Sequence, residues 1–308
     1  MLKSQLAVLS PNSNQVSTAV SHISATLNIK CSCTLKGHHV PVQRLNKPGL
    51  QTDLAEDPVS THLPTDDGGY QLYKAAGKLS GKRAIITGGD SGIGRAIALL
   101  FAMEGASSLI VYLPEEEKDA QETKRRVQEF GRECHCLAID LRKKENCRKV
   151  IDVALQTLKG IDILVNNAAY QNMLDDISDL DEWVPEPCVI SQSSVYGRIR
   201  LEKITDIPNR AQWENAFNTN IHPYFYLSKY ALPHMKRGST VLNCASVNHY
   251  IGRGDLLDYT STKGAIVAFT RGLSNQQLKN GIRVNCVCPG PSTCWINFPD
   301  YSQCTDLI

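Results

Sequence analysis

Short apolar runs alternate with amphipathic stretches of helical length from residue 83 onward. The runs that predict strands are Ala84–Thr87, Leu109–Tyr112, Cys136–Asp140, Ile163–Asn166, Thr240–Cys244 and Arg283–Val287. The stretches that predict helices are Ile93–Glu104, Glu115–Phe130, Glu145–Leu158, Gln212–Met235 and Tyr259–Lys279. This alternation is typical of a parallel sheet with helices on both faces. We therefore expect an α/β fold, a single doubly wound domain over residues 82–308, with ligands bound at the carboxyl ends of the strands.

The first 50 residues differ in composition from this body. Residues 1–34 hold ten Ser or Thr residues and no Asp or Glu. This composition predicts an organelle transit peptide, and the scarcity of arginine favours a chloroplast address over a mitochondrial one. The alternative is a disordered tail without an address, on a cytoplasmic protein. Residues 51–81 show little periodicity, and we expect them to form an arm that leads into the domain.

Charge and apolar run length exclude two classes of partner. The formal net charge is +2, and no acidic residue precedes Asp53, so the remainder of the chain is mildly acidic. Without a clustered basic face, nucleic acid is not an expected partner. The longest apolar run, Ala96–Met103, has eight residues, which is too short to span a bilayer.

The 11 cysteines are odd in number and dispersed, which favours a reducing compartment. Close pairs such as Cys134/Cys136 and Cys286/Cys288 have a single residue between the two cysteines. Structural zinc sites usually have two to four residues between paired cysteine ligands. We expect no metal site, and we expect these two pairs to act as small buried hydrophobic residues.

A glycine-rich turn follows the first predicted strand and runs directly into a helix, with the sequence Thr87-Gly88-Gly89-Asp90-Ser91-Gly92-Ile93-Gly94. Gly88 allows a tight turn, Gly92 lets the backbone approach a pyrophosphate, and Gly94 lets the helix pack on the strand. At this strand–helix junction we expect a dinucleotide site, with an ordinary glycine loop as the alternative.

Tyr259 and Lys263 stand four residues apart in the last predicted helix and therefore on one helical face. A neighbouring ammonium favours phenolate and is expected to lower the pKa of the phenol, which would make it a better acid or base near neutral pH. Ser246 follows the strand Thr240–Cys244, where its hydroxyl can meet a substrate oxygen. Taken alone, a Tyr/Lys pair with this spacing more often lies on a solvent-exposed helix face than in a catalytic site.

Together with Asn166-Asn167-Ala168-Ala169, Asn220 and Pro289-Gly290, these motifs occur in the order found in one superfamily. Residues 78–290 resemble the short-chain dehydrogenase/reductases. Residues 88–92, 116–123 and 259–270 are similar to the plant NADPH-dependent aldehyde reductases, also named glucose and ribitol dehydrogenase homologs. The resemblance implies a Rossmann-type oxidoreductase that moves a hydride between a nicotinamide cofactor and a small aldehyde, alcohol, polyol or sugar.

The resemblance also implies roles for individual residues. Tyr259 exchanges a proton with the substrate oxygen, Ser246 orients that oxygen, Lys263 holds the nicotinamide ribose, and Asn220 positions a water. Thr87, Asn166 and Asn167 tie neighbouring strands together, and Asp140 and Leu141 flank the adenine. The residues expected to contact the cofactor are Gly88, Asp90, Ser91, Gly92, Ile93, Gly94, Tyr112, Asp140, Leu141, Asn167, Ala168, Tyr259, Lys263, Pro289 and Gly290.

The choice between NADP and NAD depends on the end of the second strand. An acidic side chain there would bind the ribose 2′-hydroxyl of NAD. The chain reads Tyr112-Leu113-Pro114 and has no carboxylate until Glu115, which removes a repulsion against the 2′-phosphate of NADP. Ser91, however, stands where many NADP-dependent members carry a basic residue. We expect NADP, with NAD as the alternative.

Two features depart from the family pattern. Residues 171–201 form an extra loop, which we interpret as a surface insertion or a product of irregular splicing, with a lid over the pocket as the alternative. Ile308 follows Gly290 by only 18 residues, and Cys294 stands where the family places a threonine. We therefore expect a sheet without the last strand and helix, and a weakened homo-oligomer. The rival function is a non-catalytic or unstable truncated member that at most binds the dinucleotide.

Overall fold

The computed structural model describes residues 50–54, 58–174, 176–180 and 212–290. The predicted transit peptide, most of the predicted extra loop and residues 291–308 lie outside these ranges.

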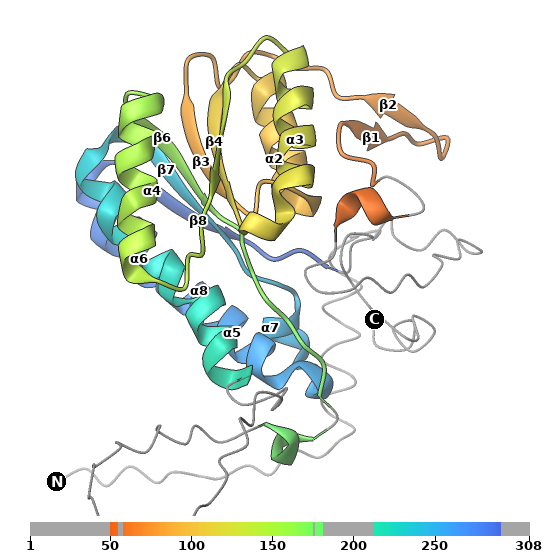
Figure 1. The fold of residues 1–308 in the computed structure, drawn as a ribbon, viewed down its shortest axis with the longest axis vertical. Coiled ribbons are helices and arrows are strands. Elements are labelled where there is room, and N and C mark those ends of the chain that lie inside the picture. Colours follow the sequence, from red (N-terminus) through yellow and green to blue (C-terminus); the bar gives the residue numbers. More distant parts are fainter. Residues whose placement is uncertain (1–49, 55–57, 175, 181–211, 291–308) are drawn as a thin grey trace, which may run out of the picture. The chain divides into compact units, whose positions relative to one another are not determined.

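The main body is a six-stranded parallel sheet (Figure 1). Its strands are β3 (Arg83–Thr87), β4 (Ser107–Tyr112), β5 (Cys134–Ala138), β6 (Ile161–Asn166), β7 (Met235–Cys244) and β8 (Arg283–Val287).

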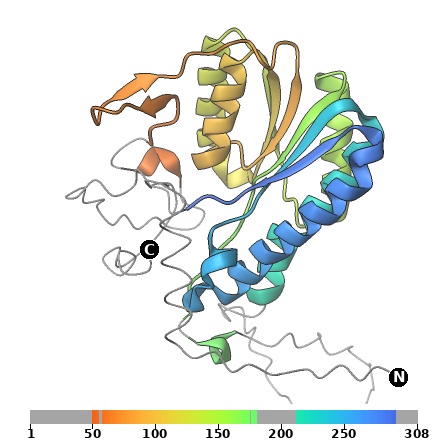
Figure 2. The same cartoon turned by 180° about the vertical axis from the view of Figure 1, so that it is seen from behind.

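Helices cover both faces of this sheet (Figures 1 and 2). One face carries α2 (Gly92–Met103) and α3 (Glu117–Glu129), and the other carries α4 (Lys144–Thr157), α6 (His222–Ala231) and α8 (Leu257–Gln277). The alternation of side chains along β3 explains the two layers. Ala84 and Ile86 pack with Leu99 of α2, whereas Ile85 between them packs with Ile151 of α4. The predicted doubly wound α/β fold is confirmed.

The strand order places a topological switch point beside β3. The sheet runs β5-β4-β3-β6-β7-β8, so the chain leaves β3 in one direction and returns on its other side at β6. Ligands of doubly wound folds bind at such a point, outside the carboxyl ends of the strands. In this sheet the switch point lies between the ends of β3 and β6, where the glycine turn begins.

The predicted helix Gln212–Met235 is wrong, because the chain forms two helices there. The first, α5 (Gln212–Asn220), ends one residue before Ile221, and α6 follows. Pro223 explains the break, since it lacks the N–H that a continuous helix needs. Met235 belongs to β7, and the third strand lies two residues earlier than predicted, so that Asp140 follows it.

The predicted arm contains a small antiparallel hairpin of β1 (His62–Pro64) and β2 (Tyr70–Leu72). All six strand residues are exposed, which explains why no hydrophobic period marked them. The remaining short elements are η1 (Gln51–Asp53), η2 (Pro114–Glu116), η3 (Ile177–Asp179), η4 (Leu232–His234), α7 (Asn248–Ile251), η5 (Gly254–Leu256) and η6 (Leu278–Asn280). None of the described helices combines the length and the apolar character needed to cross a membrane.

Candidate active site

The glycine turn between β3 and α2 is too crowded for larger residues. Gly88 and Gly92 have φ angles of +62° and +51°, in the left-handed region that favours glycine. A Cβ on Gly94 would lie 1.8 Å from the carbonyl oxygen of Gly88, and one on Gly88 would lie 3.1 Å from the Cα of Ala168. The predicted tight turn at Gly88 and the close helix–strand packing at Gly94 are confirmed.

Side-chain hydrogen bonds join the two strand ends beside this turn. The hydroxyl of Thr87 accepts the backbone N–H groups of Asn167 (2.9 Å) and Ala168 (3.0 Å). The side-chain amide of Asn167 donates to the carbonyl of Thr87 at 3.0 Å. The ends of β3 and β6 are therefore tied together, as predicted.

A second set of amides ties β6 to β7 and α8. Asn166 Nδ2 donates to Asn243 Oδ1 at 2.9 Å, and Asn243 Nδ2 donates to Thr270 Oγ1 at 2.9 Å. Asn166 and Asn243 are fully buried. The predicted structural role of Asn166 is confirmed. Its partner Asn243, and Thr270 to which Asn243 donates, carry no sequence signal beyond their polarity.

Ser246 and Tyr259 meet at the carboxyl end of β7. Ser246 lies two residues beyond that strand, and Tyr259 is the third residue of α8. Burial raises the pKa of Tyr259 to about 12, and a side-chain hydrogen bond with Ser246 opposes the rise. Near neutral pH the phenol is therefore protonated and close to the Ser246 hydroxyl.

Lys263 is buried one helical turn beyond Tyr259, with 1% of its surface exposed. Its Nζ donates to the carbonyl of Cys244 at 2.8 Å and lies 5.2 Å from the centroid of the Tyr259 ring. Burial lowers the pKa of Lys263. The predicted lowering of the Tyr259 pKa by this ammonium does not prevail. Desolvation of the phenol is the largest effect, and the pKa is raised overall.

Both polar atoms of the Asn220 side chain make hydrogen bonds. Its Oδ1 accepts the backbone N–H of Tyr170 at 2.7 Å, and its Nδ2 donates to the carbonyl of Tyr170 (2.9 Å) and to Thr262 Oγ1 (3.0 Å). This side chain joins the segment after β6 to α8 at the break between α5 and α6. Thr262 and Tyr170 are partners that the sequence did not reveal.

A carboxylate lies at the end of β4 after all. The chain turns back through η2, and Glu116 Oε2 accepts the N–H of Leu113 at 2.9 Å. Burial, and next the charge of Asp90, raise the pKa of Glu116 to about 7. The predicted absence of a carboxylate at this edge is therefore wrong, because residues 114–116 fold back and bring Glu116 to the end of β4. Tyr112 is buried beside it and donates to Glu117 at 2.8 Å.

The other predicted cofactor residues follow neighbouring strand ends. The Asp140 carboxylate accepts Arg142 Nη2 at 2.7 Å, and this ion pair lowers the pKa of Asp140. Leu141 accepts a hydrogen bond from Cys147 Sγ through its carbonyl. Pro289 accepts the N–H of Val247 at 3.1 Å, next to Ser246, and Gly290 ends the described part of that segment.

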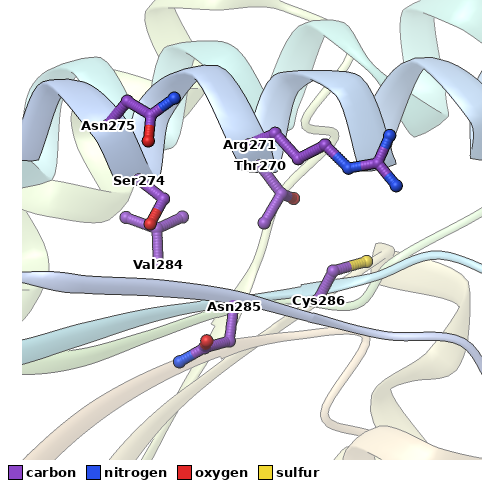
Figure 3. Close-up of a pocket in the computed structure, with 7 residues that line it drawn as sticks. All are labelled: Thr270, Arg271, Ser274, Asn275, Val284, Asn285 and Cys286. Carbon is purple, nitrogen blue, oxygen red and sulfur yellow. The ribbon is translucent and has the colours of Figure 1, made fainter.

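A separate hollow lies between α8 and β8 (Figure 3) and is lined by Thr270, Arg271, Ser274, Asn275, Val284, Asn285 and Cys286. Thr270 is about 16 Å along the helix from Tyr259, so this hollow is not part of the candidate site. Of the four paired cysteines predicted to be buried, only Cys134 is; Cys136, Cys286 and Cys288 are half-buried, on or next to the outermost strands of the described sheet.

Comparisons with known proteins agree with this geometry. Residues 82–189 match the family model described as short chain dehydrogenase, and residues 189–296 match the one described as Enoyl-(Acyl carrier protein) reductase. Glucose and ribitol dehydrogenase of Daucus carota is 40% identical over 260 residues, which are 83% of this chain and 77% of that protein. This chain belongs to the short-chain dehydrogenase/reductase family.

Two further similar proteins indicate which members of the family this short-chain dehydrogenase/reductase resembles. NADPH-dependent aldehyde reductase 1, chloroplastic, of Arabidopsis thaliana is 45% identical over 224 residues, 71% of this chain and 68% of that protein. The crystal structure of a short chain dehydrogenase from Burkholderia cenocepacia J2315 in complex with NADP superposes with a TM-score of 0.57 and 26% identity. The match covers 69% of this chain and 75% of that one. The protein is an oxidoreductase of a family that uses NAD(P), with aldehyde reductases and polyol dehydrogenases among its relatives.

Proposed function

We propose that this protein transfers a hydride between NADP(H) and a small aldehyde, or in reverse an alcohol, polyol or sugar. The observation that carries the proposal is the meeting of Ser246, Tyr259 and Lys263 at the end of β7. The protonated phenol of Tyr259 can supply a proton to a carbonyl oxygen, and the nearby Lys263 cation can stabilise the phenolate that is left behind.

The glycine turn fits the dinucleotide that this chemistry requires. A Cβ on Gly88 would crowd Asn167 and Ala168, and one on Gly94 would collide with the backbone of Gly88, so the turn lies close against its neighbours. Helix α2 begins directly after the turn, where N–H groups favour a phosphate. The turn from Gly88 to Gly94, with Asn167 and Ala168, would hold the phosphate end. When bound, the nicotinamide supplies or accepts the hydride.

The protein's own residues then handle the proton. In reduction, the Tyr259 phenol donates its proton to the substrate oxygen, and the Ser246 hydroxyl donates a hydrogen bond to the same oxygen. Lys263 stabilises the resulting phenolate. Because the Asn220 side chain is engaged with Tyr170 and Thr262, we assign the positioning of a replenishing water to its backbone carbonyl.

NADP is the cofactor we favour, with NAD as the alternative. The Arabidopsis relative is named as NADPH-dependent, and the Burkholderia structure contains NADP. Glu116 opposes this choice when it is ionised, since its carboxylate stands at the end of β4. Titration of the protein with NADPH and with NADH, followed by nicotinamide fluorescence, measures the preference directly. Tighter binding of NADH across the neutral range would contradict the proposal.

The activity itself is tested by mixing the purified protein with NADPH and a panel of short aldehydes, and in reverse with NADP and polyols. We expect loss of nicotinamide absorbance with at least one aldehyde. Measurable binding of NADPH without any turnover would contradict the proposal and favour the non-catalytic alternative.

We also propose a chloroplast location, because residues 1–34 are rich in hydroxyls and lack acids, and because the Arabidopsis relative is named chloroplastic. A fluorescent reporter fused behind residues 1–50 should enter plastids. A uniform cytosolic signal would contradict this address.

A further inference from the structure

The helix that opens at the glycine turn is capped by a residue from the N-terminal arm. Ser91 occupies the N-cap position of α2 but makes no capping hydrogen bond, because its hydroxyl donates to the Asp90 carboxylate at 2.6 Å. The side chain of Gln51 supplies the missing acceptor. Its Oε1 accepts the N–H of Gly92 at 2.7 Å, from 41 residues earlier in the chain.

A buried ion pair holds this part of the arm in place. The Asp119 carboxylate accepts the backbone N–H groups of Gln51 (2.5 Å) and Thr52 (3.2 Å). It is fully buried and pairs with Arg95 of α2 at 3.2 Å. Gln51 itself is only 3% exposed. This part of the arm therefore lies in a socket between α2 and α3, which is formed by Gly92, Arg95 and Asp119.

The same socket is connected to the glycine turn. Arg95 Nε donates to the carbonyl of Asp90 at 2.8 Å, and Thr123 Oγ1 donates to that carbonyl at 2.7 Å. The arm, the ion pair and the turn thus form one hydrogen-bonded network. The side chain of Gln51 contacts the turn directly at the Gly92 N–H.

We propose that Gln51 is a positioning residue of the dinucleotide site. By accepting the first N–H of α2, it holds the glycine turn in the conformation that leaves the next two amides, those of Ile93 and Gly94, for the phosphates of the cofactor. This inference rests on the proposed function. Without the acceptor, the turn must order when the cofactor binds, and that cost weakens binding.

Three variants of the full chain test the proposal. Gln51→Leu keeps the size of the side chain and removes the acceptor, whereas Gln51→Glu keeps an acceptor oxygen. Thr52→Ala is the matched control, because Thr52 is exposed and uses only its backbone N–H in the socket. Each variant is measured for its Kd for NADPH and for NADH, its KM for an aldehyde, its kcat at saturating cofactor, and its melting temperature.

We expect Gln51→Leu to raise the Kd of the better-bound cofactor about tenfold, since loss of a helix cap is worth roughly that factor. Its kcat and its KM for the aldehyde should stay within about twofold of the parent. Gln51→Glu keeps the acceptor but adds a negative charge beside the phosphates. It should therefore recover affinity as the pH falls and its carboxyl is protonated, whereas Gln51→Leu should not. Thr52→Ala should leave the affinity unchanged.

Three results would overturn the inference. Tighter cofactor binding by Gln51→Leu would mean that the arm competes with the dinucleotide. An unchanged Kd together with a lower melting temperature would mean that Gln51 only braces the fold. Failure of the unmodified protein to bind either cofactor would overturn the proposed function as well, and this result is distinguishable because it does not depend on the variants.

Discussion

Gly94→Ala is the substitution for which the structure defines the consequence most closely. The new Cβ would stand 1.8 Å from the carbonyl oxygen of Gly88, a backbone atom that no side-chain rotation can move. Relief requires α2 and the end of β3 to part by more than 1 Å. Overpacking of this kind costs about 1–3 kcal/mol, which lowers the melting temperature of a domain this size by roughly 2–12 °C.

The same displacement should impair the cofactor site more than it impairs the fold. A shift of about 1 Å at a positioned group can cost about 100-fold in rate, so we expect at least a tenfold rise in the Kd for NADPH. Binding is measured by nicotinamide fluorescence and unfolding by circular dichroism.

Gly272→Ala provides the matched control. Gly272 is an exposed residue of α8, and a Cβ added there meets nothing within 4 Å. This variant should gain about 0.4–1 kcal/mol of stability and bind NADPH like the parent. If Gly94→Ala melts and binds NADPH like the parent, the close approach of α2 to Gly88 does not constrain the site, and the reasoning is refuted.

Two further predictions concern the edges of the site. Because the pKa of Glu116 is raised to about 7, its carboxylate becomes charged as the pH rises through that value, so affinity for NADPH should fall between about pH 6 and 8 relative to NADH. Glu116→Gln should abolish this pH dependence, and an unchanged profile would contradict the placement of the 2′-phosphate near Glu116. Asn220→Ala should cost about 2 kcal/mol of stability and reduce kcat, because it removes the buried hydrogen bonds that the Asn220 side chain makes with Tyr170 and Thr262. A reduced kcat with unchanged melting would contradict this bracing role.

Sequence reasoning succeeded where one local pattern determines the structure. Strand β8 has the predicted bounds, Arg283–Val287. Strand β3 differs from its prediction by one residue, because its buried residues Ala84–Ile86 form an uninterrupted apolar run. The glycines at 88 and 94 were assigned correct structural roles, since only glycine tolerates those contacts. The helix break at Ile221 was missed although Pro223 marks it in the sequence.

Other parts of the site depend on contacts between distant segments. Gln51 and Gly92 are 41 residues apart, and Gln51 and Asp119 are 68 apart, so no local pattern joins them. The pKa of Tyr259 depends first on how deeply its phenol is buried, which the spacing of Tyr259 and Lys263 alone does not determine. The weakened homo-oligomer and the role of the extra loop stay predictions.

The central claim is that Tyr259 transfers the proton, and Tyr259→Phe tests it most directly. The substitution removes the hydroxyl that meets Ser246 and keeps the ring that faces Lys263. The measurement is kcat for aldehyde reduction at saturating NADPH, beside the Kd for NADPH on the same preparation. We predict a loss of about 10²–10⁴ in kcat with a nearly unchanged Kd, as expected for removal of a general acid. Retention of more than about a tenth of the parent kcat would contradict the assignment of Tyr259 as the proton donor.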